Sequence, residues 1–408
     1  MIDLKYFMIS LNQIPVITLL VLWLMILVFA GIDYYKKRTL KEYTPITFIV
    51  PCYNSEKTVR DTIRSIYESY KGHVFEVIAI NDESTDNTLN ILNQMKKNLH
   101  FRIVNNIQNL GKACSVNSVS KLAKYELLWI IDSDVILNTK AVRATLTRFQ
   151  YNPKLVAVNS SYRMINGGLL ARMQQMECSM MSIVLLAHNH YSAPYLWGGC
   201  LAVKKVAFDK VGGFSKNMLT EDGDFAFKLN EHNMHVEHSM VPVGVYSVSS
   251  LWGWYKEKIR WLSGTVQCYI KYLNVWIKRP FHVIFLLLFA ILSIFFVFSL
   301  IQQVIFFDHV WDMYLLSRET MTRILSLKVI GVYSGFVLAG WIFSKVYFFI
   351  FSVPYTIPMI KSFRDVYKVF YVIPFVLIYF PALSIIAIMS ILNGAWKHIC
   401  LSEEERAW

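Results

Sequence analysis

Two aspartates that follow a strongly apolar run could bind a metal ion. Asp132 and Asp134 flank Ser133 directly after the uncharged residues 127–131. Carboxylates this close repel each other unless a cation lies between or beside them. Oxygen ligands suit Mg²⁺ or Mn²⁺, and these ions readily take phosphate oxygens as further ligands. The pair therefore predicts a site for a metal-bound diphosphate, although so short a motif is common by itself.

A second acidic group lies at the start of a helical pattern. Glu221 and Asp222 follow Thr220, and residues 222–232 are expected to be helical. The helix dipole would hold a carboxylate at this position ionised, as a general base requires. A helix cap explains the same residues equally well when they are considered alone.

An aromatic and basic stretch over residues 252–273 could contact sugars and phosphates. Within it, Arg260 could neutralise a diphosphate leaving group, and Trp261 offers an aromatic face of the kind that suits a sugar ring. The simpler interpretation is an amphipathic helix lying on a membrane surface. The two interpretations are compatible.

Alternating strands and helices must position these groups. Strands are expected at residues 46–50, 74–80, 101–104 and 126–131, and helices at 56–70, 86–98 and 111–124. This alternation predicts an α/β fold with a parallel-rich sheet and right-handed crossovers. Ligands of such sheets bind at the carboxyl ends of the strands. Three of these ends carry polar segments, at residues 53–56, 81–86 and 132–134.

The composition sets this domain within a membrane protein. Of the 408 residues, 55% are hydrophobic and only 17% are charged, which excludes a disordered chain and an ordinary soluble enzyme. Apolar runs over residues 14–32, 281–307, 329–353 and 369–392 are each long enough to cross a bilayer as a helix. The six cysteines are scattered without a Cys-x-x-Cys pair, which argues against a disulfide framework or a structural zinc site.

The net charge of +13 is explained largely by the flanks of these runs. Basic residues cluster at 36–41 and 361–368, and four spans place both clusters on one side of the membrane. The positive-inside rule makes that side cytoplasmic. We therefore expect a multi-pass protein of the plasma membrane with a cytoplasmic catalytic domain. Nucleic-acid binding is disfavoured, because the basic residues flank the spans and form no single stripe.

In their order along the chain, the motifs resemble those of the family 2 glycosyltransferases, specifically the processive membrane polysaccharide synthases. Cellulose, chitin, hyaluronan and poly-β-1,6-N-acetylglucosamine synthases belong to this group, and the last type is nearest in size and layout. The matching segments run from about Thr47 to Trp261. They are Val50-Pro51-x-Tyr53-Asn54-x-Glu56, Asn81-Asp82-x-Ser84-Thr85-Asp86, Gly111-Lys112-Ala113, Asp132-x-Asp134, Thr220-Glu221-Asp222 and Arg260-Trp261.

The resemblance implies a role for each motif within a nucleotide-diphospho-sugar transferase (GT-A) domain. Asp222 would be the base, and Asp134 would hold the Mg²⁺ or Mn²⁺. The UDP-sugar would be bound by Tyr53, Asn54, Glu56, Asp82, Lys112, Asp132 and Arg260. The acceptor would contact Gly198, Gly199, Glu221 and Trp261.

The implied reaction is an inverting transfer from a UDP-sugar, with N-acetylglucosamine as the expected sugar. The product would be a β-linked polysaccharide that grows at the membrane and is exported beside the helices. Two alternatives stay open: a non-processive enzyme that glycosylates a lipid, and a membrane-anchored binding subunit with a decayed site. Membrane lipids and a small accessory subunit are the further partners that this family suggests.

The sequence departs from the family pattern at two places. Glu257 stands where the family usually has Gln, and a negative charge near UDP is unfavourable unless Glu257 pairs with a lysine. Glu83 and Asn87 replace the usual glycines of the second loop. The expected organisation is a membrane helix at 1–35, the GT-A domain at 36–250, an interface helix at 251–280, and three membrane helices with an interface segment at 281–408.

Overall fold

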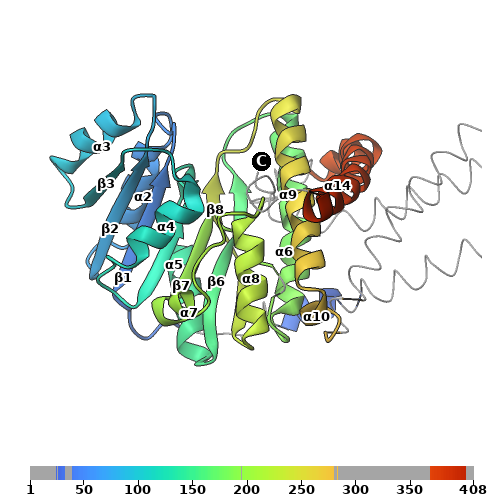
Figure 1. The fold of residues 1–408 in the computed structure, drawn as a ribbon, viewed down its shortest axis with the longest axis horizontal. Helices are drawn as coiled ribbons and strands as arrows, with labels where there is room; N and C mark the ends of the chain where they lie inside the picture. Colours follow the sequence, from blue (N-terminus) through green and yellow to red (C-terminus); the bar gives the residue numbers. More distant parts are fainter. Residues whose placement is uncertain are drawn as a thin grey trace, which may run out of the picture.

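An eight-stranded sheet with helices on both faces forms the centre of the molecule (Figure 1). The computed structural model describes residues 39–193, 195–279 and 368–400, together with residues 24, 26–32 and 283. The strand order is β3-β2-β1-β4-β7-β6-β8-β5. The strands are β1 (Ile46–Cys52), β2 (Phe75–Asp82), β3 (Arg102–Asn106), β4 (Leu127–Ile131), β5 (Val135–Ile136), β6 (Leu155–Met164), β7 (Cys200–Lys204) and β8 (His235–Val245).

The sheet has a parallel half and a mixed half. Strands β3, β2, β1 and β4 pair in parallel, as the alternation of strands and helices predicts. Strand β7 runs antiparallel to both β4 and β6, whereas β6 and β8 are parallel. The parallel-rich α/β sheet is thus confirmed. The reversal at β7 brings its first residue to the edge where the parallel strands end.

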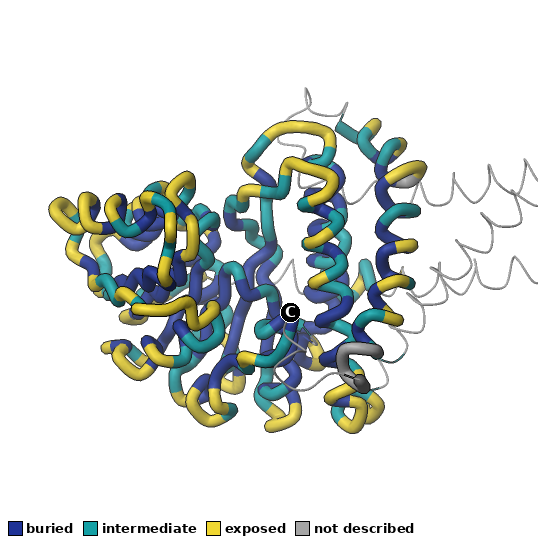
Figure 2. Tube along the Cα trace, turned by 45° about the horizontal axis from the view of Figure 1, so that its top comes forward, coloured by how far each residue is buried: buried dark blue, intermediate teal, exposed yellow. Residues whose placement is uncertain are grey.

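Each face of the sheet is covered by helices because buried strands alternate their side chains between two cores. In β1, Phe48 and Val50 join one core and Ile49 joins the other. Helices α2 (Val59–Ser69), α3 (Thr88–Lys96) and α5 (Thr139–Tyr151) pack into the first core. Helices α4 (Gly111–Ser120), α7 (Lys205–Lys210) and α8 (Glu221–Glu231) pack into the second. Strands β1 and β4 are buried along their whole length, and Figure 2 shows the buried residues gathered in the interior of the fold.

A third core lies beside the sheet and its covering helices. In it, helices pack mainly on one another. Its buried residues include Met176, Trp254 and Phe375. In Figure 1, α14 lies beside α9 and farther from the sheet. The elements of this region are α6 (Leu169–His188), α9 (Leu251–Lys271), α10 (Leu273–Trp276), α13 (Val372–Pro374), the π-helical turn η3 (Phe375–Tyr379) and α14 (Phe380–Cys400).

Within the described part of the chain, one helix is long and apolar enough to cross a membrane. It spans Lys368–Ala395 and coincides with the span expected at residues 369–392. Buried helices of soluble proteins can have the same length and composition, so this helix alone is weak support for a membrane protein. The span expected at 329–353 lies outside the described residues. So does the span at 281–307, apart from Val283, and most of the span at 14–32. The multi-pass arrangement and the expected domain bounds stay predictions.

Candidate active site

The loops that follow β1 and β2 are held together by polar side chains. Asn54 Oδ1 accepts a hydrogen bond from the backbone N–H of Thr85 (2.8 Å), and Glu56 Oε2 accepts one from that of Asn87 (3.1 Å). Asn54 has a left-handed φ of 49°, which asparagine tolerates. Asn54 and Glu56 therefore shape this rim by joining its loops, while Tyr53 is exposed beside them. Their contact with a nucleotide stays a prediction.

Asp82 is buried at the end of β2 and is fixed by three donors. Its Oδ1 accepts hydrogen bonds from Asn106 Nδ2 (2.6 Å), Leu110 N (3.0 Å) and Ser115 Oγ (2.9 Å). Among the residues that the structure describes, none donates a hydrogen bond to Oδ2. The loop therefore orients the carboxylate through one oxygen and leaves the other for a ligand.

Lys112 joins the first half of the site to the second. Its Nζ lies 2.7 Å from Asp132 Oδ1 and 3.1 Å from Glu221 Oε1, and it donates a hydrogen bond to the carbonyl of Gly198 (3.3 Å). Burial opposes the charge of Lys112, but the carboxylates of Asp132, Glu221 and Asp222 outweigh burial and raise its pKa. Burial likewise opposes ionisation of Glu221, yet Lys112 lowers the pKa of that carboxyl. The structure thus brings together four residues from distant parts of the sequence, and their contacts with a donor or an acceptor stay predictions.

Asp222 lies in the first turn of α8 and accepts two backbone hydrogen bonds. Gly198 N donates to Oδ2 (2.7 Å), and Gly223 N donates to Oδ1 (2.8 Å). Burial and the neighbouring Glu221 nevertheless raise the pKa of Asp222 to about 6. Desolvation thus opposes the helix dipole, and the group is mainly ionised at neutral pH, as a general base requires. A carboxylate with a pKa near 6 is a better proton acceptor than an ordinary aspartate.

The segment before β7 approaches the acidic residues so closely that it requires glycine. A Cβ atom on Gly198 would lie 2.9 Å from Asp222 Cβ, and one on Gly199 would lie 2.6 Å from the hydroxyl of Tyr162. The backbone also closes the site, since Asp132 N donates to Gly199 O (2.9 Å). Both glycines therefore lie between the predicted donor and acceptor residues.

Tyr162 is a site residue that the sequence does not reveal. Its hydroxyl accepts a hydrogen bond from Gly199 N (2.9 Å), and its ring packs on that of Trp197 (4.7 Å between centroids). It lies on β6 among ordinary strand residues, without a motif or a spacing that marks it. Only the antiparallel placement of β7 beside β6 brings it to the glycines.

Asp134 provides a carboxylate that suits a cation. Burial and the charge of Asp132 raise its pKa to about 7, so the pair is unfavourable as two bare anions. Lys112 already contacts Asp132, and Asp134 stays the predicted metal ligand. No group of three or more His, Cys, Asp or Glu side chains that could hold a metal occurs among the described residues. The donor set still fits Mg²⁺ or Mn²⁺, because such ions commonly use one or two carboxylates together with substrate phosphates.

Helix α9 brings Arg260 to the same end of α8. Arg260 Nη1 donates to the carbonyl of Leu219 (3.2 Å), just before the acidic residues of α8. Glu257 Oε1 lies 3.3 Å from Lys258 Nζ, so the unusual acid does pair with a lysine. The same Nζ lies 4.0 Å from the ring centroid of Trp261.

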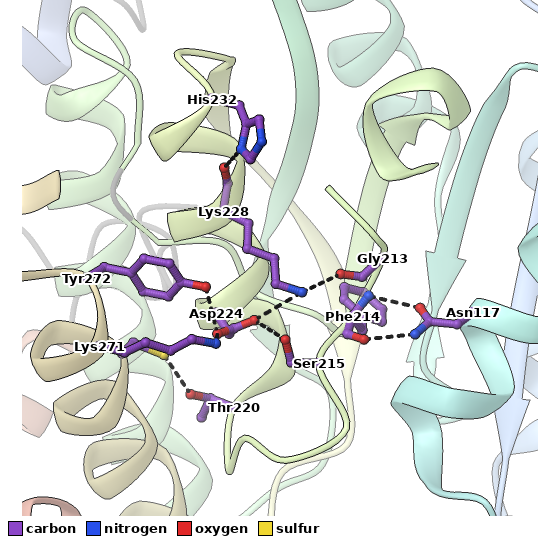
Figure 3. A network of polar contacts seen from close by, with 11 residues as sticks. Asn117, Gly213, Phe214, Ser215, Thr220, Asp224, Lys228, His232, Lys271 and Tyr272 are labelled. Carbon is purple, nitrogen blue, oxygen red and sulfur yellow. Dashed lines mark hydrogen bonds and ion pairs between the residues drawn. The ribbon is translucent and has the colours of Figure 1, made fainter. Parts of the chain in front are cut away.

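Asp224 holds α8 and α9 together (Figure 3). This fully buried carboxylate accepts hydrogen bonds from Ser215 Oγ (2.6 Å), Lys271 Nζ (2.6 Å) and Tyr272 OH (3.0 Å). Lys228 Nζ is 3.5 Å away on the next turn of α8. No sequence motif marks Asp224. Its position two residues after Asp222 would have been the only signal, and an acid there is equally typical of a helix start.

Part of the chain is similar to known glycosyltransferases. Residues 47–212 match the model described as glycosyl transferase family 2. A poly-β-1,6-N-acetyl-D-glucosamine synthase from Staphylococcus epidermidis is 31% identical over 229 residues, which are 54% of either chain. The synthase of the same name from Staphylococcus aureus (strain COL) is 30% identical over 227 residues, 55% of either chain. The aligned region thus spans about half the length of the curated relatives.

A solved structure supports the fold independently. The mannosyltransferase from Pyrobaculum calidifontis in complex with GDP-Man and Mn²⁺ superposes with a TM-score of 0.58 at 16% identity, covering 94% of this chain and 99% of its own. At this identity the likeness concerns the fold alone, a GT-A-like mixed α/β sheet. The match over residues 47–212 covers the motifs from Val50 to Asp134, so this part of the chain is similar to a family 2 glycosyltransferase domain.

Proposed function

We propose that the chain is an inverting glycosyltransferase that extends a β-linked polysaccharide with sugar from a UDP-sugar. The observation that carries the proposal is the position of Asp222, a partly buried carboxylate with a pKa raised to about 6 that lies against Gly198. Lys112 links the neighbouring Glu221 to Asp132 on the donor side. The predicted base is therefore adjacent to the predicted donor site.

The mechanism is an in-line displacement at the anomeric carbon. Asp222 takes the proton of an acceptor hydroxyl while that oxygen forms its bond to the anomeric carbon. The bond from this carbon to the diphosphate breaks with its electron pair, and UDP leaves. Attack from the opposite face inverts the configuration, so an α-linked donor gives a β-linkage. Arg260, held near Glu221 by the carbonyl of Leu219, would face the negative charge that develops on the diphosphate.

The binding roles follow the two sides of the site. On the donor side, the free oxygen of Asp82 and the exposed ring of Tyr53 would contact the nucleoside. On the acceptor side, Trp261 would stack on the terminal sugar beside Gly198 and Gly199. A divalent cation held by Asp134 would neutralise charge on the departing diphosphate.

The named relatives support N-acetylglucosamine as the sugar and a polymer as the acceptor. Both Staphylococcus proteins are named as synthases of poly-β-1,6-N-acetyl-D-glucosamine. These names do not favour the glycolipid-forming alternative. The four acids Asp82, Asp132, Asp134 and Asp222 all reach the site, which argues against a decayed binding subunit.

We further propose that the domain lies on the cytoplasmic side of the plasma membrane and that the product is exported. Exposed apolar side chains along α9, among them Leu251, Trp252 and Ile270, support contact with the surface of a bilayer. The apolar helix at Lys368–Ala395 packs against the same helix. A small accessory subunit stays a prediction from the family resemblance.

The test uses membranes that contain the full chain and a panel of UDP-sugars with Mg²⁺ or Mn²⁺. We expect UDP release with UDP-N-acetylglucosamine and a product retained in the aqueous fraction as long polymer. A short product in the organic extract would instead indicate glycolipid synthesis. An absence of UDP release with every UDP-sugar would contradict the proposal.

A further inference from the structure

Lys258 is a buried cation in the middle of α9. Only 2% of its side chain is exposed, and its Nζ lies 3.0 Å from Glu177 on α6 and 3.3 Å from Glu257. Burial of an ammonium group is unfavourable unless it is paired and hydrogen-bonded. Lys258 therefore requires its carboxylate partners, Glu177 and Glu257. Its other contacts indicate what its burial achieves.

The remaining contact of Lys258 is the ring of Trp261. The Nζ atom lies 4.0 Å from the ring centroid, well within the range of a cation–π interaction. The two residues are three positions apart on α9, so they lie on neighbouring turns of one helix face. The ammonium group thus restricts the indole from one side, and the two carboxylates hold the ammonium group in place.

Glu177 extends this group of contacts to the last described segment of the chain. The hydroxyl of Tyr379, on η3, donates a short hydrogen bond to Glu177 Oε2 and accepts one from Trp254 Nε1 (2.8 Å). Trp254 lies on α9, one turn before Lys258. Three elements, α6, α9 and η3, therefore meet through polar contacts directly beside Trp261.

We propose that Lys258, held by Glu177, is a positioning residue that fixes Trp261 as the platform for the acceptor sugar. The same contacts tie this platform to η3 and the apolar helix that follows it. The inference rests on the proposed function, because it assigns Trp261 to the acceptor. It predicts that binding of the growing chain depends on α6 and on η3. Of these two elements, η3 lies outside residues 47–212.

The kinetic test compares Lys258→Met with Lys256→Met in membranes containing the full chain. Lys256 is a matched control, because its Nζ lies 5.2 Å from the ring of the exposed Trp252 on the same helix. With a β-linked N-acetylglucosamine tetramer as the acceptor probe, we expect Lys258→Met to raise the acceptor KM about tenfold and to shorten the polymer. The KM for UDP-N-acetylglucosamine should stay unchanged, and Lys258→Arg should restore most of the loss.

Two outcomes would overturn the inference. One is a Lys258→Met enzyme with the acceptor KM and product length of Lys256→Met. The other is an equal loss in both substrates, which would indicate a purely structural role. Glu177→Gln, which keeps the side-chain volume, should give the same acceptor defect in a weaker form if Lys258→Met fails to fold.

A stability measurement separates this inference from the proposed function. In a double-mutant cycle of Lys258→Met and Glu177→Gln, the shifts in Tm should fall short of additivity by about 3 °C. Additive shifts would contradict the Lys258–Glu177 contact whatever the enzyme does. If wild-type membranes release no UDP from any UDP-sugar, the proposed function fails, and with it the acceptor role of Trp261, while the cycle still decides whether Glu177 holds Lys258.

Discussion

Two acids, the buried Asp82 and the partly buried Asp222, have different surroundings in the fold. Asp82, at the end of a parallel strand, is fixed by three donors that all reach one oxygen. Asp222, at the start of α8, accepts two backbone hydrogen bonds and lies beside another carboxylate, which helps to raise its pKa to about 6. The first environment suits recognition of a fixed partner. The second suits transfer of a proton.

The predicted binding residues and the predicted base come from different segments of the chain. The donor side is built from the loops after β1, β2 and β4, which share one edge because their strands are parallel. The acceptor side is built from β7, α8 and α9, whose contacts join residues far apart in sequence. Substitutions on the first side should change the KM for the donor, and those on the second should change turnover.

The largest effect is expected for Asp222→Asn. Asparagine cannot accept the proton of the acceptor, so kcat should fall about 10³-fold, as is typical for loss of a general base. The rate of UDP release, measured at saturating UDP-sugar, tests this expectation. Asp209→Asn, on the exposed surface of α7, is the matched control.

The wild-type pH profile checks the same assignment. Because a base must be deprotonated to act and the pKa of Asp222 is raised to about 6, activity should fall as the pH drops through about 6. A profile that stays flat down to pH 4 would contradict the assignment of Asp222 as the base.

Asp224→Asn tests whether the acceptor side depends on its buried ion pairs. The substitution removes the charge partner of the partly exposed Lys271 and of Lys228, and we expect a loss of about 2 kcal/mol in the free energy of unfolding. Thermal or denaturant unfolding of the purified chain measures this loss. A variant as stable as the wild type would show that Asp224 does not hold α8 to α9.

Gly198→Ala should impair turnover by displacing the base. The new Cβ would lie 2.9 Å from Asp222 Cβ, closer than side-chain carbons can approach, and we expect a loss of about 30-fold in kcat. Gly167→Ala is the control, because a Cβ there meets no atom within 4 Å. Equal activities of the two variants would show that the close approach at Gly198 is unimportant.

Asp82→Asn should affect the donor alone. Asparagine keeps one acceptor oxygen for the loop but loses the charged oxygen for the ligand, so the KM for the UDP-sugar should rise about tenfold with little change in kcat. A titration with UDP measures the same effect without turnover. A fall in kcat with an unchanged KM would remove the distinction between the two acids.

The smallest effect is expected for Glu257→Gln. Lys258 retains Glu177 at 3.0 Å, and burial already raises the pKa of Glu257, so a neutral amide should change the activity by less than about threefold. A larger loss would show that the charge of Glu257 is required for the reaction.

The positions of most donor-side residues could be predicted from the sequence. These polar residues directly follow apolar runs that are recognisable as strands. Parallel pairing then brings such ends to one edge, as Asp82 and Asp132 show. Lys112 was selected through the family resemblance, whereas Asp222 was first suggested by its place at the start of a helical pattern.

Other features could not be predicted because they depend on contacts between distant segments. Tyr162 reaches Gly199 only because β7 runs antiparallel beside β6. The raised pKa of Asp222 depends on how deeply the folded chain buries it, which the helix-start pattern does not encode. The burial of Lys258 likewise requires Glu177 from α6, which no local motif indicates.

The place of β7 in the middle of the sheet has a consequence for how the protein is made. During synthesis, β1 to β4 are complete well before β7, which must pair with β4 on one side and β6 on the other. Until residues 200–204 leave the ribosome, β4 has an open, fully apolar edge that could pair with another chain. Slow translation of the segment between β4 and β7 should therefore increase aggregation of the nascent protein, and faster delivery of β7 should reduce it.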